Sequence, residues 1–306
     1  MCRVLAYLGS PVVVDDLLYQ PDSSLVQQTV QPRMLNLLNL AGFGMAAWDD
    51  ASHLPDIPFE YGTTQVPVFD ANLKALATKT RANCLLAHVR GVAYSHTVQV
   101  SRQNLHPFRY PDAKVALAHN GDLASFAQMK LDLIEHVRPE IVRFVHGTTD
   151  SEWIYALFLS QLEDPGARPG SSAEILRALE NTFRILRQVR ERVGIYQSSS
   201  VNLFVTDGVH LVATRFTFDF GCWGNTIHEA NLSYLSQWYT AGQDYGLHNG
   251  EWKMVGGTQN PDSVIVASEP LTADHSTWLE VPEYSAVFVD TDARGLRYPR
   301  IAELDA

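Results

Sequence analysis

The sequence contains few cysteines, no concentration of basic charge and no long apolar run, and each absence excludes a class of protein. Its three cysteines, Cys2, Cys84 and Cys222, are too few for a disulfide framework, so we expect a reducing, cytoplasmic compartment. The formal net charge is -11 and no stretch is rich in lysine or arginine, which argues against nucleic acid and anionic membranes as partners. The most apolar stretch, residues 34–48, is too short and too interrupted by asparagine and glycine to be a transmembrane helix.

Patterns for metal binding and for secretion are missing as well. The 11 histidines form no pair or cluster at zinc spacing, so we expect no metal and no other cofactor. The N-terminus has neither the basic segment nor the apolar run of a signal peptide. The composition, with 46% hydrophobic and 19% charged residues, is that of an ordinary globular protein. Because no repeat or shift in composition marks a boundary, we expect a single domain over residues 1–306.

Cys2 stands directly behind the initiator Met1, and removal of Met1 would leave a chain that begins with cysteine. Such a residue carries both a thiol and a free α-amine. A thiol becomes a useful nucleophile once a base has taken its proton, and an α-amine with a pKa of about 7.7 to 8.0 can be that base near neutral pH. The apolar run Val4–Leu8 predicts a buried strand that would hold this terminus in place. The alternative interpretation is that Cys2 is merely a small apolar residue at the start of the strand.

Hydrophobic periodicity predicts strands and helices in a mixed order. Residues 201–206 and 209–214 form a strong hairpin pattern around the two-residue turn Asp207-Gly208, whereas 49–69 is typical of a loop. The other expected strands are 42–48, 83–89, 115–118, 264–267 and 286–290. The expected helices are 71–80, one after Asp122, one after Thr149 and 174–193. The last two have an amphipathic pattern. Strands, then helices, then further strands indicate an α+β fold.

Polar residues follow two of the predicted strands. Arg90 ends the strand 83–89, a position that fits a surface arginine as well as a ligand-binding one. Asn120 and Gly121 follow the next strand, and Asn-Gly is typical of a tight turn that needs positive φ. Alternatively, the Asn120 amide and the Gly121 N–H point together at a developing oxyanion. The helical pattern after Asp122 disfavours a simple hairpin.

Asp150 lies at the start of a predicted helix. Thr149 followed three residues later by Glu152 fits a capping box, which places Asp150 in the first turn. The helix dipole favours a negative charge there, and this accounts for Asp150 without any substrate. The position alone therefore leaves a structural and a ligand-binding role open.

These motifs occur in the order found in a known family. Together they resemble a class II glutamine amidotransferase domain of the N-terminal nucleophile (Ntn) hydrolase superfamily. The motifs that carry the resemblance are Met1-Cys2-Arg3, Ala87-His88-Val89-Arg90, Asn104-Leu105-His106-Pro107-Phe108, His119-Asn120-Gly121 and Gly147-Thr148-Thr149-Asp150-Ser151-Glu152. The longer start Met1–Gly9 and the segment Val264–Leu271 resemble the standalone branch that contains the ergothioneine-pathway γ-glutamyl hydrolase and the glutathione-degrading amidohydrolase subunit. The likeness runs from Met1 to about Leu271 and is poorest over 216–261, an elaborated segment.

The resemblance implies a four-layer αββα sandwich of the Ntn hydrolase type and roles for five residues. Cys2 would be the nucleophile with its own α-amine as base, and Asn120 and Gly121 would form the oxyanion hole. Arg90 would bind the α-carboxylate of a γ-glutamyl group, and Asp150 would bind its α-ammonium. Attack on the γ-carbonyl would expel an amine or ammonia, and water would then release glutamate from a thioester.

Three functions compete on this basis. The leading hypothesis is hydrolysis of a small γ-glutamyl amide that is free in solution. The alternative is a glutaminase subunit that supplies ammonia to a separate synthase partner, and a partner amidohydrolase subunit is also conceivable in this branch. A third is a catalytically silent interaction module, against which the intact set of five residues argues.

Segment 39–44 lacks the aspartate that many relatives carry there, so the contacts of that strand are expected to differ from theirs. The segment 216–261 is our candidate for recognising the leaving group.

Overall fold

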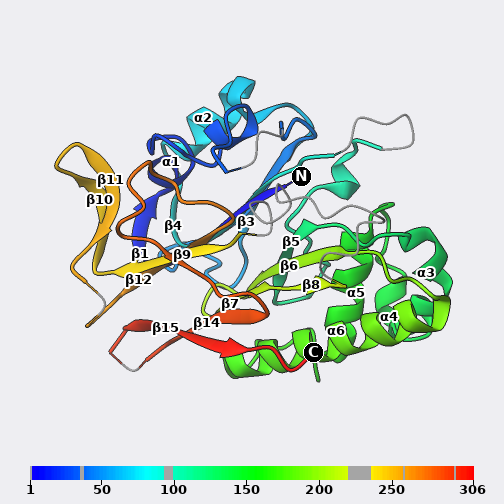
Figure 1. Cartoon of the computed structure of the whole chain (residues 1–306). Coiled ribbons are helices and arrows are strands. Elements are labelled where there is room, and N and C mark those ends of the chain that lie inside the picture. The colour runs from blue at the N-terminus through cyan, green and yellow to red at the C-terminus, as the bar shows by residue number, and fades with distance from the viewer. Residues whose placement is uncertain (1, 35–37, 93–98, 220–235, 258, 293) are drawn as a thin grey trace.

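Two antiparallel β-sheets lie face to face at the centre of the molecule, and helices cover both outer faces (Figure 1). The computed structural model describes residues 2–306 apart from 35–37, 93–98, 220–235, 258 and 293. The layers run helix, sheet, sheet, helix, which confirms the αββα sandwich that the resemblance implied. Within the described residues, no helix is both long enough and apolar enough to span a membrane.

The first sheet has the strand order β13-β9-β12-β1-β4-β2-β3 among the described residues. Its strands are β1 (Arg3–Val13), β2 (Phe43–Trp48), β3 (Phe59–Thr63), β4 (Arg81–Val89), β9 (Trp238–Gly242), β12 (Ser263–Ala267) and β13 (Leu279–Glu280). A thin layer packs on its outer face. This layer comprises α1 (Val14–Leu18), α2 (Ala71–Ala77), the 3-10 turns Gln27–Thr29 and Pro67–Phe69, and the hairpin of β10 (Asp244–His248) and β11 (Glu251–Val255).

The second sheet has the order β15-β14-β7-β6-β5, and β8 also pairs with β6. Its strands are β5 (Ala116–Gly121), β6 (Ser199–Thr206), β7 (Leu211–Arg215), β8 (Thr217–Phe218), β14 (Ser285–Thr291) and β15 (Arg297–Glu303). A thicker helical layer covers its outer face. The helices are α3 (Phe126–Ile134), α4 (Pro139–Val142), α5 (Asp150–Gln161) and α6 (Ser172–Val193), and a 3-10 turn, Arg102–Asn104, precedes β5.

Strand β1 holds the N-terminus at the centre of the first sheet, between β12 and β4. Its side chains alternate between two cores, as the period of a strand requires. Leu5 and Tyr7 face the thin helical layer, whereas Val4, Ala6 and Leu8 face the second sheet. All five are at most 1% exposed, so the strand predicted at Val4–Leu8 is buried on both faces. The same alternation directs Cys2 toward the space between the sheets.

Several elements differ from the sequence-based expectation. The stretch 49–69 contains β3, an edge strand that pairs with β2, although it was expected to be a loop. The amphipathic pattern expected for α5 is wrong, because every residue from Ser151 to Ser160 is buried between the second sheet and the neighbouring helices α3, α4 and α6. The predicted hairpin forms from β6 and β7, but Thr206 pairs with Leu211, so its loop has four residues, 207–210, instead of two.

The C-terminal third contributes to both sheets. Of segment 216–261, β9 pairs with β12 inside the first sheet, and the β10–β11 hairpin packs on the outer face of that sheet. Residues 220–235 of this segment lie outside the described residues. Beyond Leu271, β14 and β15 complete one edge of the second sheet. The fold therefore uses the chain beyond Leu271, the last residue of the motifs quoted from the sequence.

Candidate active site

The backbone register of the first sheet places Cys2 beside Arg90. Arg3 of β1 pairs with Val89 of β4, so the residue before β1 and the residue after β4 lie at the same end of adjacent strands. The Cys2 thiol is 7% exposed and lies 3.6 Å from the carbonyl oxygen of Gly91, to which it donates. The structure thus brings the expected nucleophile and the expected carboxylate-binding arginine together.

A buried ion pair fixes the strand start behind Cys2. Arg3 Nε lies 3.3 Å from Glu269 Oε2, and Arg3 Nη1 donates to the carbonyl oxygen of Cys2 at 3.0 Å. The Glu269 carboxylate also accepts from the backbone N–H groups of Arg33 and Met34, at 3.1 and 3.2 Å. The main chain of the nucleophile is therefore tied to the end of β12 and to the loop around residue 33.

Asn120 and Gly121 end β5 and do not form a turn. They pair in regular antiparallel register with Asn202 and Val201 of β6, which excludes the hairpin-turn interpretation. Gly121 is required for close packing, because a Cβ there would lie 1.8 Å from the backbone oxygen of Ser200. Glycine thus allows two backbones to approach closely, and positive φ is not the reason for it.

The side chain of Asn120 is linked to the nucleophile strand through Ser268. Asn120 is 2% exposed, and its Nδ2 donates to Ser268 Oγ at 3.1 Å. The same Ser268 oxygen accepts from the backbone N–H of Val4 at 3.0 Å. Because Val4 is two residues from Cys2, this pair of hydrogen bonds places the amide of the second sheet close to the nucleophile of the first.

Arg90 is buried and lies within the electrostatic influence of Asp150. Arg90 is 5% exposed and donates to the Gln99 carbonyl at 3.1 Å. Burial lowers the pKa of the Arg90 guanidinium, and the electrostatic effect of the neighbouring Cys2 and Asp150 side chains opposes that shift. Asp150 is half-buried, and its Oδ2 accepts from the backbone N–H of Leu123 at 2.7 Å. This bond joins the start of α5 to the chain just past Gly121.

The predicted cap of α5 forms only in part. Thr149 Oγ1 accepts from the Glu152 N–H at 3.3 Å, as a capping box requires. The Glu152 carboxylate, however, turns to the backbone N–H groups of His146 and Gly147, at 3.0 and 2.6 Å, instead of returning to Thr149. The capping hydrogen bond does not involve the Asp150 carboxylate, whose Oδ2 accepts from the Leu123 N–H and whose Oδ1 accepts from the Ser151 N–H at 2.8 Å.

Three buried histidines, whose roles the sequence did not indicate, lie behind the site. His88 Nε2 and His106 Nδ1 are 2.7 Å apart, and burial lowers the pKa of both rings well below the usual 6.5. His119 Nε2 donates to the Ser200 carbonyl at 3.2 Å, and its Nδ1 lies 2.9 Å from Ser151 Oγ. All three stand in motifs that carried the family resemblance. Within the described residues, no group of three or more potential metal-ligating side chains gathers.

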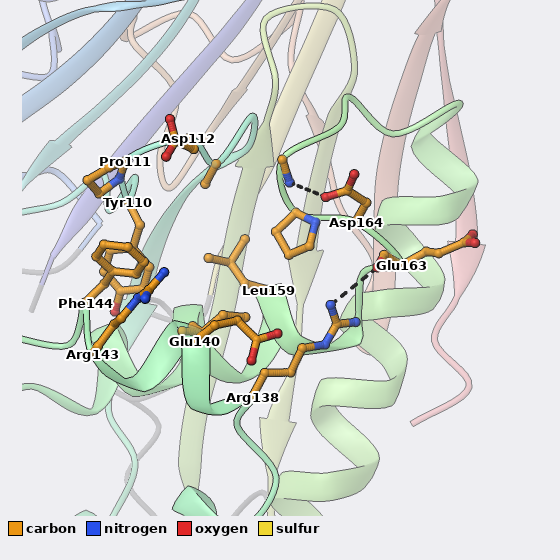
Figure 2. Close-up of a pocket in the computed structure, with 14 residues that line it drawn as sticks. Tyr110, Pro111, Asp112, Arg138, Glu140, Arg143, Phe144, Leu159, Glu163 and Asp164 are labelled. Carbon is orange, nitrogen blue, oxygen red and sulfur yellow. Dashed lines mark hydrogen bonds between the residues drawn. The ribbon is translucent and has the colours of Figure 1, made fainter.

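A separate pocket of about 290 Å³ contains none of the five predicted site residues (Figure 2). It lies between the loop 110–113, the start of α4 and the loop 163–166. Its polar contacts are structural: Arg138 donates to the Glu163 carbonyl at 3.3 Å, and the Gly166 N–H donates to Asp164 at 2.8 Å. Neither cysteine nor histidine lines this pocket.

The fold and the site define an Ntn-hydrolase-like protein with a cysteine at the start of a central strand. Residues 42–297 match the model of the family described as glutamine amidotransferases class-II, and the chain belongs to this family. The matched range includes Arg90, Asn120, Gly121 and Asp150 and begins after Cys2.

Two relatives extend the likeness to nearly the whole chain. The chain is 29% identical to the probable glutamine amidotransferase DUG3 of Saccharomyces cerevisiae, over 94% of this chain and 82% of that protein. It is 24% identical to the gamma-glutamyl-hercynylcysteine sulfoxide hydrolase of Mycolicibacterium smegmatis, over 94% of this chain and 96% of that protein.

Solved structures support the fold. A glutamine aminotransferase class-II domain protein from Silicibacter pomeroyi superposes with a TM-score of 0.62 at 20% identity, and each chain covers 100% of the other. Glutamine phosphoribosylpyrophosphate amidotransferase from B. subtilis gives a TM-score of 0.56 at 14% identity, over 99% of this chain and 49% of that one.

Proposed function

We propose that this chain hydrolyses a γ-glutamyl amide bond, with Cys2 as an N-terminal nucleophile. The observation that carries the proposal is the convergence of four groups on one end of the two sheets. Cys2 and Arg90 meet through the pairing of β1 with β4, Asn120 is hydrogen-bonded to a serine that also holds Val4, and the charge of Asp150 acts on Arg90. A thiol, an amide donor, a cation and a carboxylate thus share one region, which suits acyl transfer from an amino acid.

The chemistry follows from these groups. In a chain that begins with Cys2, the α-amine takes the thiol proton, and the thiolate attacks the γ-carbonyl carbon. The resulting oxyanion accepts hydrogen bonds from Asn120 Nδ2 and the Gly121 N–H. The C–N bond breaks as the amine leaves with the proton, and a γ-glutamyl thioester remains on Cys2. Water, deprotonated by the α-amine, then attacks the thioester and releases glutamate.

The substrate class follows from the charges beside the nucleophile. A γ-glutamyl group carries an α-carboxylate and an α-ammonium at one end, and Arg90 and Asp150 supply the opposite charges. Arg90 is well suited to a carboxylate because guanidinium is planar and stays charged. The names of the two relatives support this class, since one refers to a γ-glutamyl compound and the other to glutamine, itself the simple γ-amide of glutamate.

Cleavage of γ-glutamyl amides by the purified protein tests the proposal. Wild-type protein with a mass that shows loss of Met1 is incubated with glutamine and with several γ-glutamyl amides, and free glutamate is measured. We expect turnover by the wild type and none by Cys2→Ala, which exchanges one small buried residue for another and keeps the fold. Turnover by Cys2→Ala would refute the mechanism.

The covalent step has its own measurement. Diazo-oxo-norleucine, a γ-glutamyl-like electrophile, should add one adduct mass to the wild type and none to Cys2→Ala.

Retention of Met1 or an N-terminal tag should remove most activity, because it eliminates the free α-amine of Cys2. Full activity in an unprocessed protein would show that the α-amine is not the base. If hydrolysis is found only with an added synthase, the glutaminase-subunit alternative holds instead.

A further inference from the structure

Ser268 occupies the position directly after β12, on the face between the two sheets. In β12, Val264 and Val266 face the second sheet, whereas Ile265 and Ala267 face the thin helical layer. The alternation of a strand therefore directs Ser268 toward the second sheet, and its side chain is 4% exposed. A buried hydroxyl at this interface needs hydrogen-bond partners, and it finds them in both sheets.

The Ser268 hydroxyl oxygen connects the strand of the nucleophile to the strand of the oxyanion residues. It accepts from the Val4 N–H at 3.0 Å and from Asn120 Nδ2 at 3.1 Å. The serine itself is held by its backbone. Its N–H donates to the Val4 carbonyl at 3.0 Å, and its carbonyl accepts from Ser236 Oγ at 2.9 Å. The backbone thus holds Ser268 in place, and the side-chain amide of Asn120 is hydrogen-bonded to it.

The carboxamide of Asn120 depends on this one contact. Its Oδ1 is buried and makes no hydrogen bond, so within the described part of the chain Ser268 alone orients the group. An asparagine amide has two N–H donors. One is used by Ser268, which fixes the plane of the carboxamide, and the second is left for another acceptor.

We infer that Ser268 is a positioning residue for the oxyanion hole, an inference that rests on the proposed function. By holding one Nδ2 hydrogen of Asn120, it directs the other at the oxygen of the tetrahedral intermediate on Cys2. Preorganised donors of this kind act because they need no reorientation when the charge appears. Without the hydroxyl, the amide could rotate and the donor would be present but badly aimed.

The kinetic test compares Ser268→Ala with a matched control on γ-glutamyl-p-nitroanilide. We expect kcat to fall about ten-fold with KM within about two-fold, since the affected contact arises in the transition state. The control is Ser263→Ala at the other end of β12, where Oγ accepts from the Ser10 N–H of β1 at 3.2 Å. Ser263 is 1% exposed and makes the same type of bond between the same two strands, so its removal should leave kcat unchanged.

A double variant separates positioning from general destabilisation. If Ser268 acts through Asn120, adding Ser268→Ala to Asn120→Ala should lower kcat by less than about two-fold further. Three results would overturn the inference: a Ser268→Ala enzyme with normal kcat, a loss that multiplies in full with Asn120→Ala, or an equal loss in Ser263→Ala.

A measurement on the wild type makes the test independent of turnover. In the NMR spectrum of the ¹⁵N-labelled protein, the Asn120 side-chain amide is the signal that disappears in Asn120→Ala. One of its two hydrogens should be protected from exchange with solvent by the bond to Ser268. Two freely exchanging hydrogens would overturn the inference. This result does not depend on whether the protein cleaves the anilide, so a failure of the proposed function would be seen separately.

Discussion

Arg3 and Glu269 form an ion pair with exposures of only 2% and 1%, directly behind Cys2. The two residues are 266 positions apart in the sequence: Arg3 begins β1, and Glu269 lies two residues after the neighbouring strand β12. Charges removed from water in this way are costly unless their remaining hydrogen-bonding groups are satisfied. Here they are, because Arg3 also donates to the Cys2 carbonyl and Glu269 accepts two backbone N–H groups.

Glu269→Ala should therefore lower the free energy of unfolding by about 3 to 5 kcal/mol, because it leaves the Arg3 charge buried and unpaired. Urea unfolding followed by circular dichroism measures this change. The control is Arg184→Ala, which breaks a 2.8 Å pair with Asp305 whose side chains are 40% and 91% exposed. That substitution should cost at most about 1 kcal/mol. Equal effects of the two substitutions would mean that the buried pair does not anchor the terminus.

Substrate anchoring and transition-state stabilisation should separate kinetically. Arg90 and Asp150 would bind groups that are charged before reaction, so Arg90→Ala or Asp150→Ala should raise KM strongly, with a loss of kcat where orientation suffers. Asn120 would meet a charge that exists only in the transition state. Asn120→Ala should lower kcat by about 10² to 10³ with a much smaller change in KM. Melting temperatures of the same preparations are the control, since a lower Tm with unchanged kcat would make Asn120 purely structural.

The buried histidines predict an acid-sensitive fold. Burial, with the Arg90 charge second, lowers the pKa of His88, and burial with the neighbouring His88 lowers that of His106. An unfolded histidine has a pKa near 6.5. As the pH falls below that value, the two histidines bind protons in the unfolded chain but remain unprotonated in the folded chain. Stability should decrease with acid, by up to about 1.4 kcal/mol per pH unit for each ring.

Urea unfolding between pH 7 and pH 5 measures how steeply the free energy of unfolding decreases with acid. His106→Gln should reduce that slope by an amount that corresponds to the binding of about one proton. His210 is an internal contrast. Burial alone would lower its pKa, but the hydrogen bond to Asp207 and the charges of Asp207 and Asp290 raise it. Its stabilising contribution is complete below pH 6.5 and disappears as the pH rises through the folded-state pKa, so His210→Gln should leave the acid slope in place. An unchanged slope in His106→Gln would show that its ring is not the group that titrates.

Local sequence patterns were sufficient for the elements that carry the site. The apolar run after Cys2 predicts β1, the pattern after Asp122 predicts α3, and Thr149 followed by Glu152 predicts the start of α5. Each depends on residues that are neighbours in sequence. The edge strand β3 could not be found in this way, because its five residues are at least partly exposed and it is held by pairing with β2.

The contacts that organise the site are not local. Ser268 lies 264 residues from Val4 and 148 from Asn120, and it reaches both only through the register of two sheets. A shift of one residue in either register would turn these side chains to the opposite face. Sequence patterns identify which residues belong to a strand, but not which partner faces them across an interface. The family motifs could therefore indicate five candidate site residues, whereas the contacts of Ser268 and of the histidines behind the site required the structure.

Substitution of Gly121 tests whether this glycine is needed for the close packing of β5 against β6, as the structure indicates, and not for a turn. Gly121→Ala should prevent normal pairing of β5 with β6, because the new Cβ would lie 1.8 Å from the Ser200 oxygen and 2.5 Å from His119 Nε2. A backbone oxygen cannot give way as a flexible side chain can, so the end of β5 must shift. We expect loss of most activity together with a lower Tm.

The control is Gly170→Ala, an exposed glycine whose added Cβ would make ordinary contact at 3.7 Å with Glu174 Oε2. It should leave both Tm and kcat unchanged. Thermal melts and anilide turnover on the same preparations distinguish the possibilities. If Gly121→Ala has wild-type Tm and kcat while Gly170→Ala does too, the close approach of β5 and β6 is not required. If Gly121→Ala loses kcat but keeps its Tm, the shift is confined to the N–H that would face the oxyanion.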